Sequence, residues 1–177
     1  MEKDHYGLHT ICSIDYDTED FTLIKKALDK TAYKEKLRLR SYGVPGERDP
    51  VYLELKKKLR GVTYKRRIPL SLENARLYLE NGILPEETGQ IFQEIDWFLR
   101  QRPLSAKVML CYDRIALFGR ENTDFRITFD ADIRWRDYNL DLGKGDYGTP
   151  LLQPGGRVME IKTGGALPLA VPYTHRK

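Results

Sequence analysis

The sequence predicts an α+β protein whose antiparallel sheet is flanked by helices. Segments in which apolar and polar residues alternate, as in half-buried strands, occur before and after a central helical region. Strands and helices do not alternate regularly along the chain, which argues against a doubly wound parallel sheet. The strands are similar in length, so the sheet can close into an antiparallel β-barrel with the helices outside.

The first part of the chain contains one short predicted helix among four strands. Residues 20–30 have Phe21, Ile24 and Leu28 at helical spacing, which predicts one shared face. Gly61 separates the last two strands and predicts a hairpin. The strands are expected at 9–16, 35–42, 51–59 and 62–68.

Two helices follow, and then three more strands. Ser71 is a candidate N-cap and Gly82 a helix stop, which places one helix between them. A second helix is expected over 85–100, because Pro103 cannot continue it. Strands are expected at 107–118, 125–133 and 157–163, with a Gly- and Pro-rich loop at 137–156 and no clear periodicity after Gly164.

The composition indicates one globular domain. At 177 residues the chain is long enough to bury a substantial core, and 41% hydrophobic with 32% charged residues fits a water-exposed surface. A net charge of +4 favours anionic partners. The chain has no apolar run near the ~18 residues of a membrane helix. Cys12 and Cys111 have no metal-ligand spacing. We therefore expect a soluble, cytoplasmic protein.

The strand pattern is the most informative feature of the sequence. Residues two apart in a strand share a face, so Lys36, Arg38 and Arg40 lie together, opposite Leu37 and Leu39. An ordinary sheet with one solvated face is one explanation. Long cations dominate the polar faces of five strands, however, and solubility alone would mix the signs. The other shared faces are Glu54 with Lys56 and Lys58, Tyr112 with Arg114, Arg126 with Thr128 and Asp130, and Glu160 with Lys162.

If the apolar faces turn outward under the helices, these cations line the interior. Crowding cations in a confined space is unfavourable unless anions are present, and a phosphate chain supplies them. Acids among the cations could form ion pairs or hold a divalent metal such as Mg²⁺. Glu160 is the first candidate for such a metal ligand, and Glu54 is the second.

Seven short segments, in order, resemble motifs of the VTC domain of polyphosphate polymerases. Each is weak alone, but together they extend over roughly residues 9–165. They are DYDT at 15–18, KLRLRSYG at 36–43, VYLELKKK at 51–58, YKRR at 64–67, YDRIA at 112–116, FRITFD at 125–130 and VMEIK at 158–162.

The resemblance implies a triphosphate tunnel fold, which the CYTH superfamily shares, and ATP-dependent synthesis of polyphosphate. It implies a cytoplasmic domain whose partners are ATP and inorganic polyphosphate and whose cofactor is Mn²⁺ or Mg²⁺. Attachment to a membrane protein at the inner face of the membrane stays open. The implied catalytic cations are Arg38, Arg40, Lys56, Arg114 and Arg126. The implied substrate contacts are Lys36, Lys65, Lys162 and Tyr112. The implied metal ligands are Glu160 and, second, Glu54.

Three other functions stay open. A tunnel hydrolase would use the same cations but normally needs additional acids to position water. A non-catalytic module would only bind polyphosphate or nucleotides. A nucleic-acid partner is the least favoured, because the aromatic residues do not interleave with the basic faces as a stacking platform requires; no specific nucleic acid is expected.

Both ends of the chain depart from the family pattern. The family begins with a further strand containing an ExK-type element and continues after the last motif into a helix with an SKY-like element. This sequence has neither. We therefore expect residues 1–177 to form a single domain that lacks the first strand and the C-terminal helix of the fold, with a free strand edge.

Overall fold

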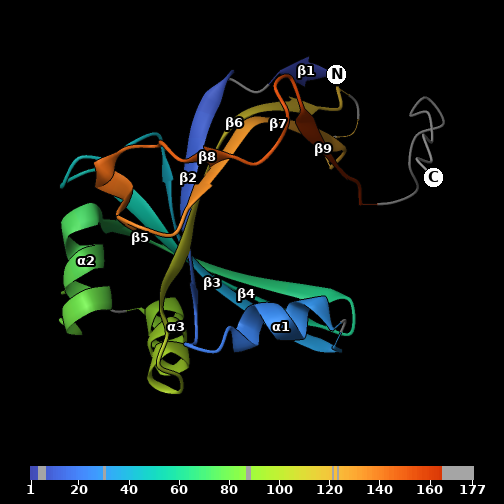
Figure 1. The fold of residues 1–177 in the computed structure, drawn as a ribbon. Helices are drawn as coiled ribbons and strands as arrows, with labels where there is room; N and C mark the ends of the chain where they lie inside the picture. The colour runs from blue at the N-terminus through green and yellow to red at the C-terminus, as the bar shows by residue number, and fades with distance from the viewer. Residues whose placement is uncertain (4–6, 30, 87–88, 121, 123, 165–177) are drawn as a thin grey trace.

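A single antiparallel sheet of nine strands, with three α-helices beside it, makes up the part of the chain that the structure describes (Figure 1). The structure is a computed structural model and describes residues 1–3, 7–29, 31–86, 89–120, 122 and 124–164. The elements are β1 (Glu2–Lys3), β2 (His9–Asp17), α1 (Thr22–Leu28), β3 (Tyr33–Tyr42), β4 (Pro50–Leu59), β5 (Val62–Ser71), α2 (Leu72–Asn81), α3 (Gln90–Arg100), β6 (Ser105–Phe118), β7 (Arg126–Arg136), the 3₁₀ turn η1 (Leu142–Lys144), β8 (Thr149–Pro150) and β9 (Arg157–Lys162).

The sheet is open, with two free ends. Its strands follow the order β5-β4-β3-β2-β6-β7-β8, with β1 also on β6 and β9 also on β7. Among the described residues, β5 and β9 are not paired with each other, so the barrel is not closed between them. The predicted α+β class with an antiparallel sheet is confirmed. The C-terminal helix of the family was expected to be lacking after Gly164, and that segment lies outside the described residues.

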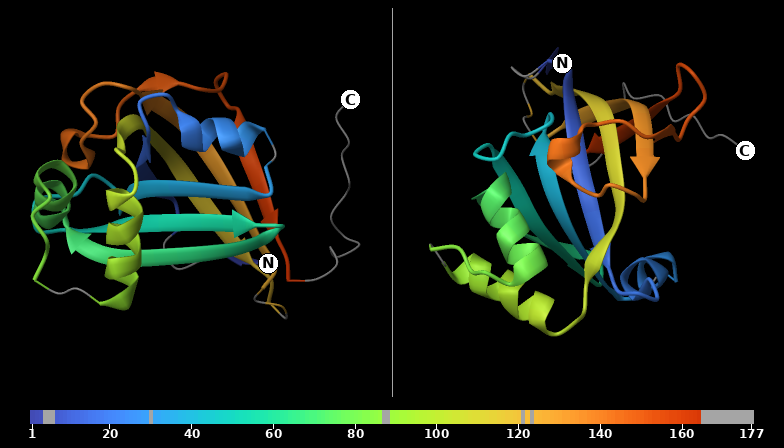
Figure 2. Two further views of the ribbon diagram at one scale, coloured as in Figure 1. Left: turned by 90° about the horizontal axis from the view of Figure 1, so that it is seen from below. Right: turned by 60° about the vertical axis from the view of Figure 1, so that its left-hand side comes forward.

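The strands form because their residues alternate, and the alternation decides what each face touches. Leu37 and Leu39 of β3 and Leu53 and Leu55 of β4 are each no more than 3% exposed. They pack with the apolar sides of α2 and α3, which cover this face of the sheet (Figure 2). Burial of these side chains supplies the main stabilisation of the fold.

The boundaries of α2 agree with the sequence signals. The Ser71 hydroxyl accepts a hydrogen bond from the Asn74 backbone N–H at 3.1 Å. Gly82 takes the left-handed conformation at the other end, with φ 71°, where an L-residue would be strained.

The Ser71 cap gives a first prediction. Ser71→Ala leaves the Asn74 N–H without this acceptor, so we expect the free energy of unfolding to fall by about 1 kcal/mol. Urea denaturation measures it. Ser105→Ala, at the exposed start of β6, is the control and should change stability by less than about 0.5 kcal/mol. Equal effects of the two changes would rule out the cap as the cause.

The first helix differs from its prediction. It is shorter than 20–30, and Phe21, Ile24 and Leu28 are exposed while Leu23 is the buried residue. Asp17 explains the orientation, because its carboxylate accepts the backbone N–H groups of Leu23 at 2.9 Å and of Ile24 at 3.0 Å. This anchoring of the helix N-terminus sets which side chain turns inward.

Other boundaries differ in smaller ways. The third helix begins at Gln90 rather than 85, after two positions outside the described residues. The predicted loop 137–156 contains η1 and β8, and β1 was not predicted; each is only two or three residues long, too short for a periodic pattern.

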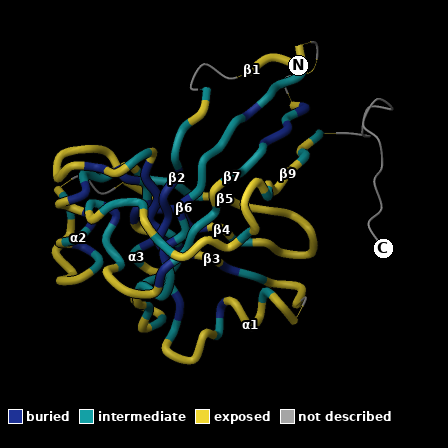
Figure 3. The backbone as a smooth tube through the Cα atoms, turned by 45° about the horizontal axis from the view of Figure 1, so that its top comes forward, coloured by how far each residue is buried: buried dark blue, intermediate teal, exposed yellow. Residues whose placement is uncertain are grey.

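Strand β9 pairs with β7, and no helix in the described part of the chain covers it. All but one of its residues are exposed (Figure 3), including Met159 at 52%. The condition that the apolar strand faces turn outward under the helices is therefore not met by β9. Among the helices of the described residues, none has the length and apolar character that a membrane crossing requires.

Candidate functional site

The predicted cations lie on the inner face, defined here as the face of the sheet opposite α2 and α3. The strand register forms cross-strand rows on this face. Asp15 of β2 is opposite Arg38 of β3, which is opposite Glu54 of β4, which is opposite Arg67 of β5. The adjacent row consists of Lys36, Lys56 and Lys65. The first row alternates in sign, whereas the second places lysines directly opposite one another, which destabilises a sheet unless counter-charge is nearby.

Glu54 supplies counter-charge at the centre of three strands. Its side chain is 2% exposed and its carboxylate lies 2.7 Å from Arg38 Nε, 2.9 Å from Lys65 Nζ and 3.5 Å from Arg67 Nε. Burial raises the pKa of Glu54, but Lys65, Arg38 and Arg40 together lower it by more, so that the net pKa is about 2. Glu54 is therefore a carboxylate at neutral pH, and it ties β3, β4 and β5 together on the inner face.

Arg40 interacts electrostatically with Glu54 but forms no direct ion pair among the described residues. It is 8% exposed, and its Nη2 donates to the Tyr112 hydroxyl at 3.3 Å. Among the described residues its buried Nε has no hydrogen-bond partner and no acid pairs with it. Burial, followed by the charge of Arg38, lowers the pKa of Arg40. A buried guanidinium in this state is a strong site for a phosphate oxygen.

Arg114 is held in place by Asp130 of the neighbouring strand. The two form a bidentate pair, with Nε to Oδ1 at 2.6 Å and Nη2 to Oδ2 at 2.7 Å. Burial lowers the pKa of Arg114, but the hydrogen bonds with Asp130 and the charges of Tyr112, Asp130 and Glu160 together raise it above its ordinary value. The guanidinium also lies 5.0 Å from the Tyr112 ring centroid. Arg114 is thus a fixed positive charge next to Tyr112.

The β7 and β9 strands add a second group with unpaired atoms. The Arg126 Nε and the Thr128 hydroxyl are buried and have no hydrogen-bond partner among the described residues. Thr128 is opposite Glu160, and Arg126 is opposite Lys162. Glu160 and Lys162 are about half exposed and pair with each other at 3.3 Å. This region combines cations with one accessible carboxylate.

Electrostatic interactions join the two halves of the inner face. Burial and then Arg38, Lys162 and Lys36 lower the pKa of Lys56, while Glu160 raises it. Glu160 also raises the pKa of Arg114. Only β7 lies between β6 and β9, but β4 and β9 are far apart in the sheet order, so the interaction of Lys56 with Glu160 requires the sheet to curl. The cations therefore face a shared interior.

The acids were expected either to pair with cations or to hold a metal. Glu54 forms ion pairs with three cations, which favours pairing; its role as a metal ligand stays a prediction. Glu160 is more open, with Oε1 near Lys162. Among the described residues, no three His, Cys, Asp or Glu side chains gather so as to hold a metal ion. The donor set fits an ion such as Mg²⁺, which takes one or two carboxylates and completes its shell with phosphate oxygens.

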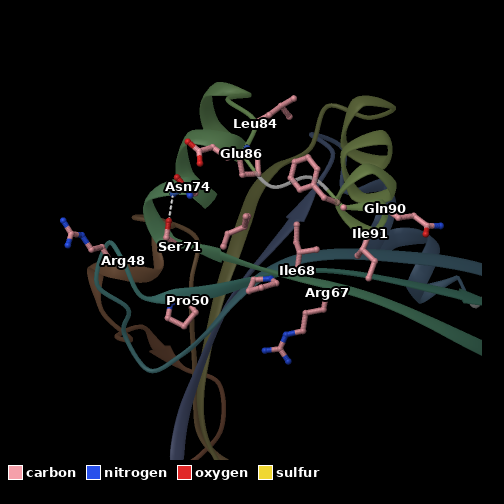
Figure 4. Close-up of a pocket in the computed structure, with 15 residues that line it drawn as sticks. Arg48, Pro50, Arg67, Ile68, Ser71, Asn74, Leu84, Glu86, Gln90 and Ile91 are labelled. Carbon is pink, nitrogen blue, oxygen red and sulfur yellow. Dashed lines mark hydrogen bonds between the residues drawn. The ribbon is translucent and has the colours of Figure 1, made fainter.

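Sequence reasoning missed several inner-face residues. Arg67 is two positions after Lys65 and therefore shares its face, a signal that the strand spacing already contained. Figure 4 shows Arg67 turned away from the helices, while Ile68 points toward them. Tyr42 and Tyr52 also lie among the inner-face cations, so the expectation that aromatics do not interleave with basic residues is wrong here.

A cavity of about 1020 Å³ lies between β5 and the helices α2 and α3 (Figure 4). Its lining includes Ile68, Leu70, Leu84 and Ile91, and of the inner-face cations it includes Arg67. Its walls mix apolar with polar side chains, and most of its lining comes from the helix side of β5 and from the helices, so it is separate from the charged interior.

Comparison with known proteins identifies the family. The sequence profile of the VTC domain matches residues 2–173. A candidate adenylate cyclase from Bacillus halodurans has 16% identity and a TM-score of 0.49, over 74% of this chain and 64% of that one. Another from Vibrio parahaemolyticus has 13% identity and a TM-score of 0.37, over 70% and 52%. The chain thus spans less than two thirds of either structure. No protein with a curated description matches it.

Proposed function

The chain belongs to the VTC-domain family, and on that premise we propose that it is an ATP-dependent polyphosphate polymerase domain. The observation that supports this proposal is the shared interior of long cations in which Arg40 and Arg126 have buried, unpartnered guanidinium nitrogens. Unpaired buried cations are unfavourable, and a phosphate chain supplies closely spaced negative oxygens that satisfy them.

The reaction is a phosphoryl transfer. A terminal oxygen of polyphosphate bonds to the γ-phosphorus of ATP, the bond from that phosphorus to the β–γ bridging oxygen breaks, and ADP leaves with the electron pair. Because the attacking oxygen is already anionic, no general base is required. Arg38, Arg40 and Lys56 orient the donor phosphates, while Arg114 and Arg126 stabilise charge in the transition state.

A divalent cation fits the same scheme. Glu160 would hold Mn²⁺ or Mg²⁺, which when bound neutralises charge on the phosphate oxygens. The half-exposed carboxylate can reach a ligand without breaking the Glu54 cluster. ATP and inorganic polyphosphate are the partners in this proposal, and it places the reaction in the cytoplasm, with attachment to a membrane protein as an extension.

Glu160→Gln tests the proposal. We expect polymer formation from ATP and Mn²⁺ to fall on the order of 100-fold, because a ligand for the metal is lost. Affinity for tripolyphosphate without metal should change less than about three-fold. Chain length on gels and calorimetry measure the two effects. Glu73→Gln, exposed in the first turn of α2, is the control and should change neither.

The same assay separates the alternative functions. Release of free phosphate without chain growth would identify a hydrolase. Tripolyphosphate binding with no turnover of ATP, in the presence or absence of Mn²⁺, would identify a binding module. Failure to bind tripolyphosphate would contradict all tunnel functions of the inner face.

A further inference from the structure

An aromatic cluster lies at one end of the inner face, where β3 ends. Tyr42 of β3, Tyr52 of β4 and Arg67 of β5 make it up, and they are called the aromatic end below. The Arg67 guanidinium carbon lies 3.6 Å from the Tyr52 ring centroid and 5.6 Å from that of Tyr42. Arg67 Nη2 donates to the Tyr42 hydroxyl at 3.3 Å. The two rings meet edge to face, with centroids 5.7 Å apart.

The exposure of Tyr42 distinguishes it from a packing residue. It is 50% exposed, although Arg67 and Tyr52 both contact it, whereas Tyr78 in the hydrophobic core is 6% exposed. A ring held in place by its neighbours with half its surface open is suited to stacking against a flat partner. Aromatic rings and arginine guanidinium planes are the groups on which nucleobases stack.

The spacing relates this cluster to the phosphate-binding cations. Arg38, Arg40 and Tyr42 are two residues apart on one face of β3, so each step is about 7 Å. The unpaired Nε of Arg40 is therefore one step from the exposed ring. A molecule with a flat aromatic group at one end and several phosphates at the other matches this order.

We propose that Tyr42, Tyr52 and Arg67 bind the nucleobase of a nucleoside triphosphate whose phosphates lie on Arg40 and Arg38. The inference rests on the proposed function and adds that the nucleotide donor is held by its base as well as by its phosphates. It also gives the donor a direction, with the nucleoside at the aromatic end and the γ-phosphate toward Arg38. Because stacking area decides the affinity, purines bind better than pyrimidines.

Binding of two probes tests the base site. A non-hydrolysable ATP analogue has both base and phosphates, and tripolyphosphate has phosphates only. Tyr42→Leu should weaken binding of the analogue about ten-fold and leave tripolyphosphate unchanged, because only the stacking contact is lost. Tyr42→Phe keeps the ring and should retain most of the affinity. Calorimetry at fixed salt and Mg²⁺ measures the dissociation constant of each probe for wild type, Tyr42→Leu and Tyr42→Phe.

Tyr64→Leu is the matched control. Tyr64 is 51% exposed and lies on the helix side of β5, where it pairs across the strands with Lys57. Its replacement should change the affinity for neither probe. An equal loss for both probes in Tyr42→Leu, or no loss for the analogue, overturns the base site while the phosphate site stands. If the wild-type chain binds neither probe, both the base site and the proposed function fail.

Discussion

Replacing Glu54 with glutamine is expected to lower the free energy of unfolding by about 3 kcal/mol at neutral pH. The carboxylate is 2% exposed and joins Arg38, Lys65 and Arg67 from two neighbouring strands. Glutamine preserves the shape but leaves three cations close together without their anion. Removing one partner of a buried charge cluster typically costs about 3–5 kcal/mol. Urea denaturation of the two proteins measures the difference.

Glu94→Gln is the matched control. Glu94 also joins two cations, Lys57 at 3.1 Å and Arg66 at 2.7 Å, but it lies on the helix side and is 33% exposed. Solvent screens that cluster, so we expect a loss of less than about 1 kcal/mol. A similar loss in the two variants would mean that the inner face is no more confined than the protein surface.

The stabilisation that the Glu54 carboxylate contributes to the fold should decrease as the pH falls. Its pKa is depressed in the folded protein to about 2, against an ordinary value of 4.5. The stabilisation is therefore fully present above about pH 5 and is lost as the pH falls toward 2. The difference in stability between wild type and Glu54→Gln should shrink over this range. A difference that stays constant from pH 7 to pH 2.5 would contradict the assigned ionisation.

A phosphate chain should compensate for the missing carboxylate. Tripolyphosphate binds only the folded state in this scheme, so it raises the melting temperature. In Glu54→Gln the ligand also supplies the anion that Arg38 and Lys65 have lost. We therefore expect a larger increase in melting temperature than in wild type. A smaller increase would show that Glu54 positions the cations rather than competing for them.

The local part of this site could be predicted from the sequence, because it follows from the two-residue period of a strand. That period alone places Arg38 and Arg40 opposite Leu37 and Leu39, and the burial of the leucines confirms it. The same rule applied to β5 would have identified Arg67. The caps of α2 were predictable for a similar reason, since Ser71 and Gly82 act within one helical turn.

Long-range features could not be predicted in this way. The interaction of Glu160 with Lys56 depends on how the sheet curls through the four strands between β4 and β9, and no local pattern encodes that. The β6–β7 pairing shifts register between Cys111 and Asp113, so alternation cannot be extended through it. The partner of each acid likewise depends on strand order, which is why pairing and metal binding by Glu54 could not be separated beforehand.

Replacing Arg40 with methionine should separate binding from stability. Arg40 is buried, pairs with no acid among the described residues, and has an unpartnered Nε. Burial and the charge of Arg38 lower its pKa more than Tyr112, Glu54 and Tyr42 raise it, so its charge stabilises the ligand-free fold little. We expect the free energy of unfolding without ligand to stay constant or rise by about 1 kcal/mol, since methionine fills similar volume without a buried charge.

Binding should change in the opposite direction. A phosphate oxygen that loses a charged hydrogen-bond donor in a buried site loses about 2–3 kcal/mol, so tripolyphosphate affinity should fall roughly 100-fold. Arg100→Met is the control, because Arg100 lies on α3, is 64% exposed and pairs with Asp96. It should leave affinity unchanged. The opposite result would be that Arg40→Met unfolds the protein while any folded fraction binds tripolyphosphate normally. Arg40 would then stabilise the sheet through its hydrogen bond with Tyr112 and would not bind an anion.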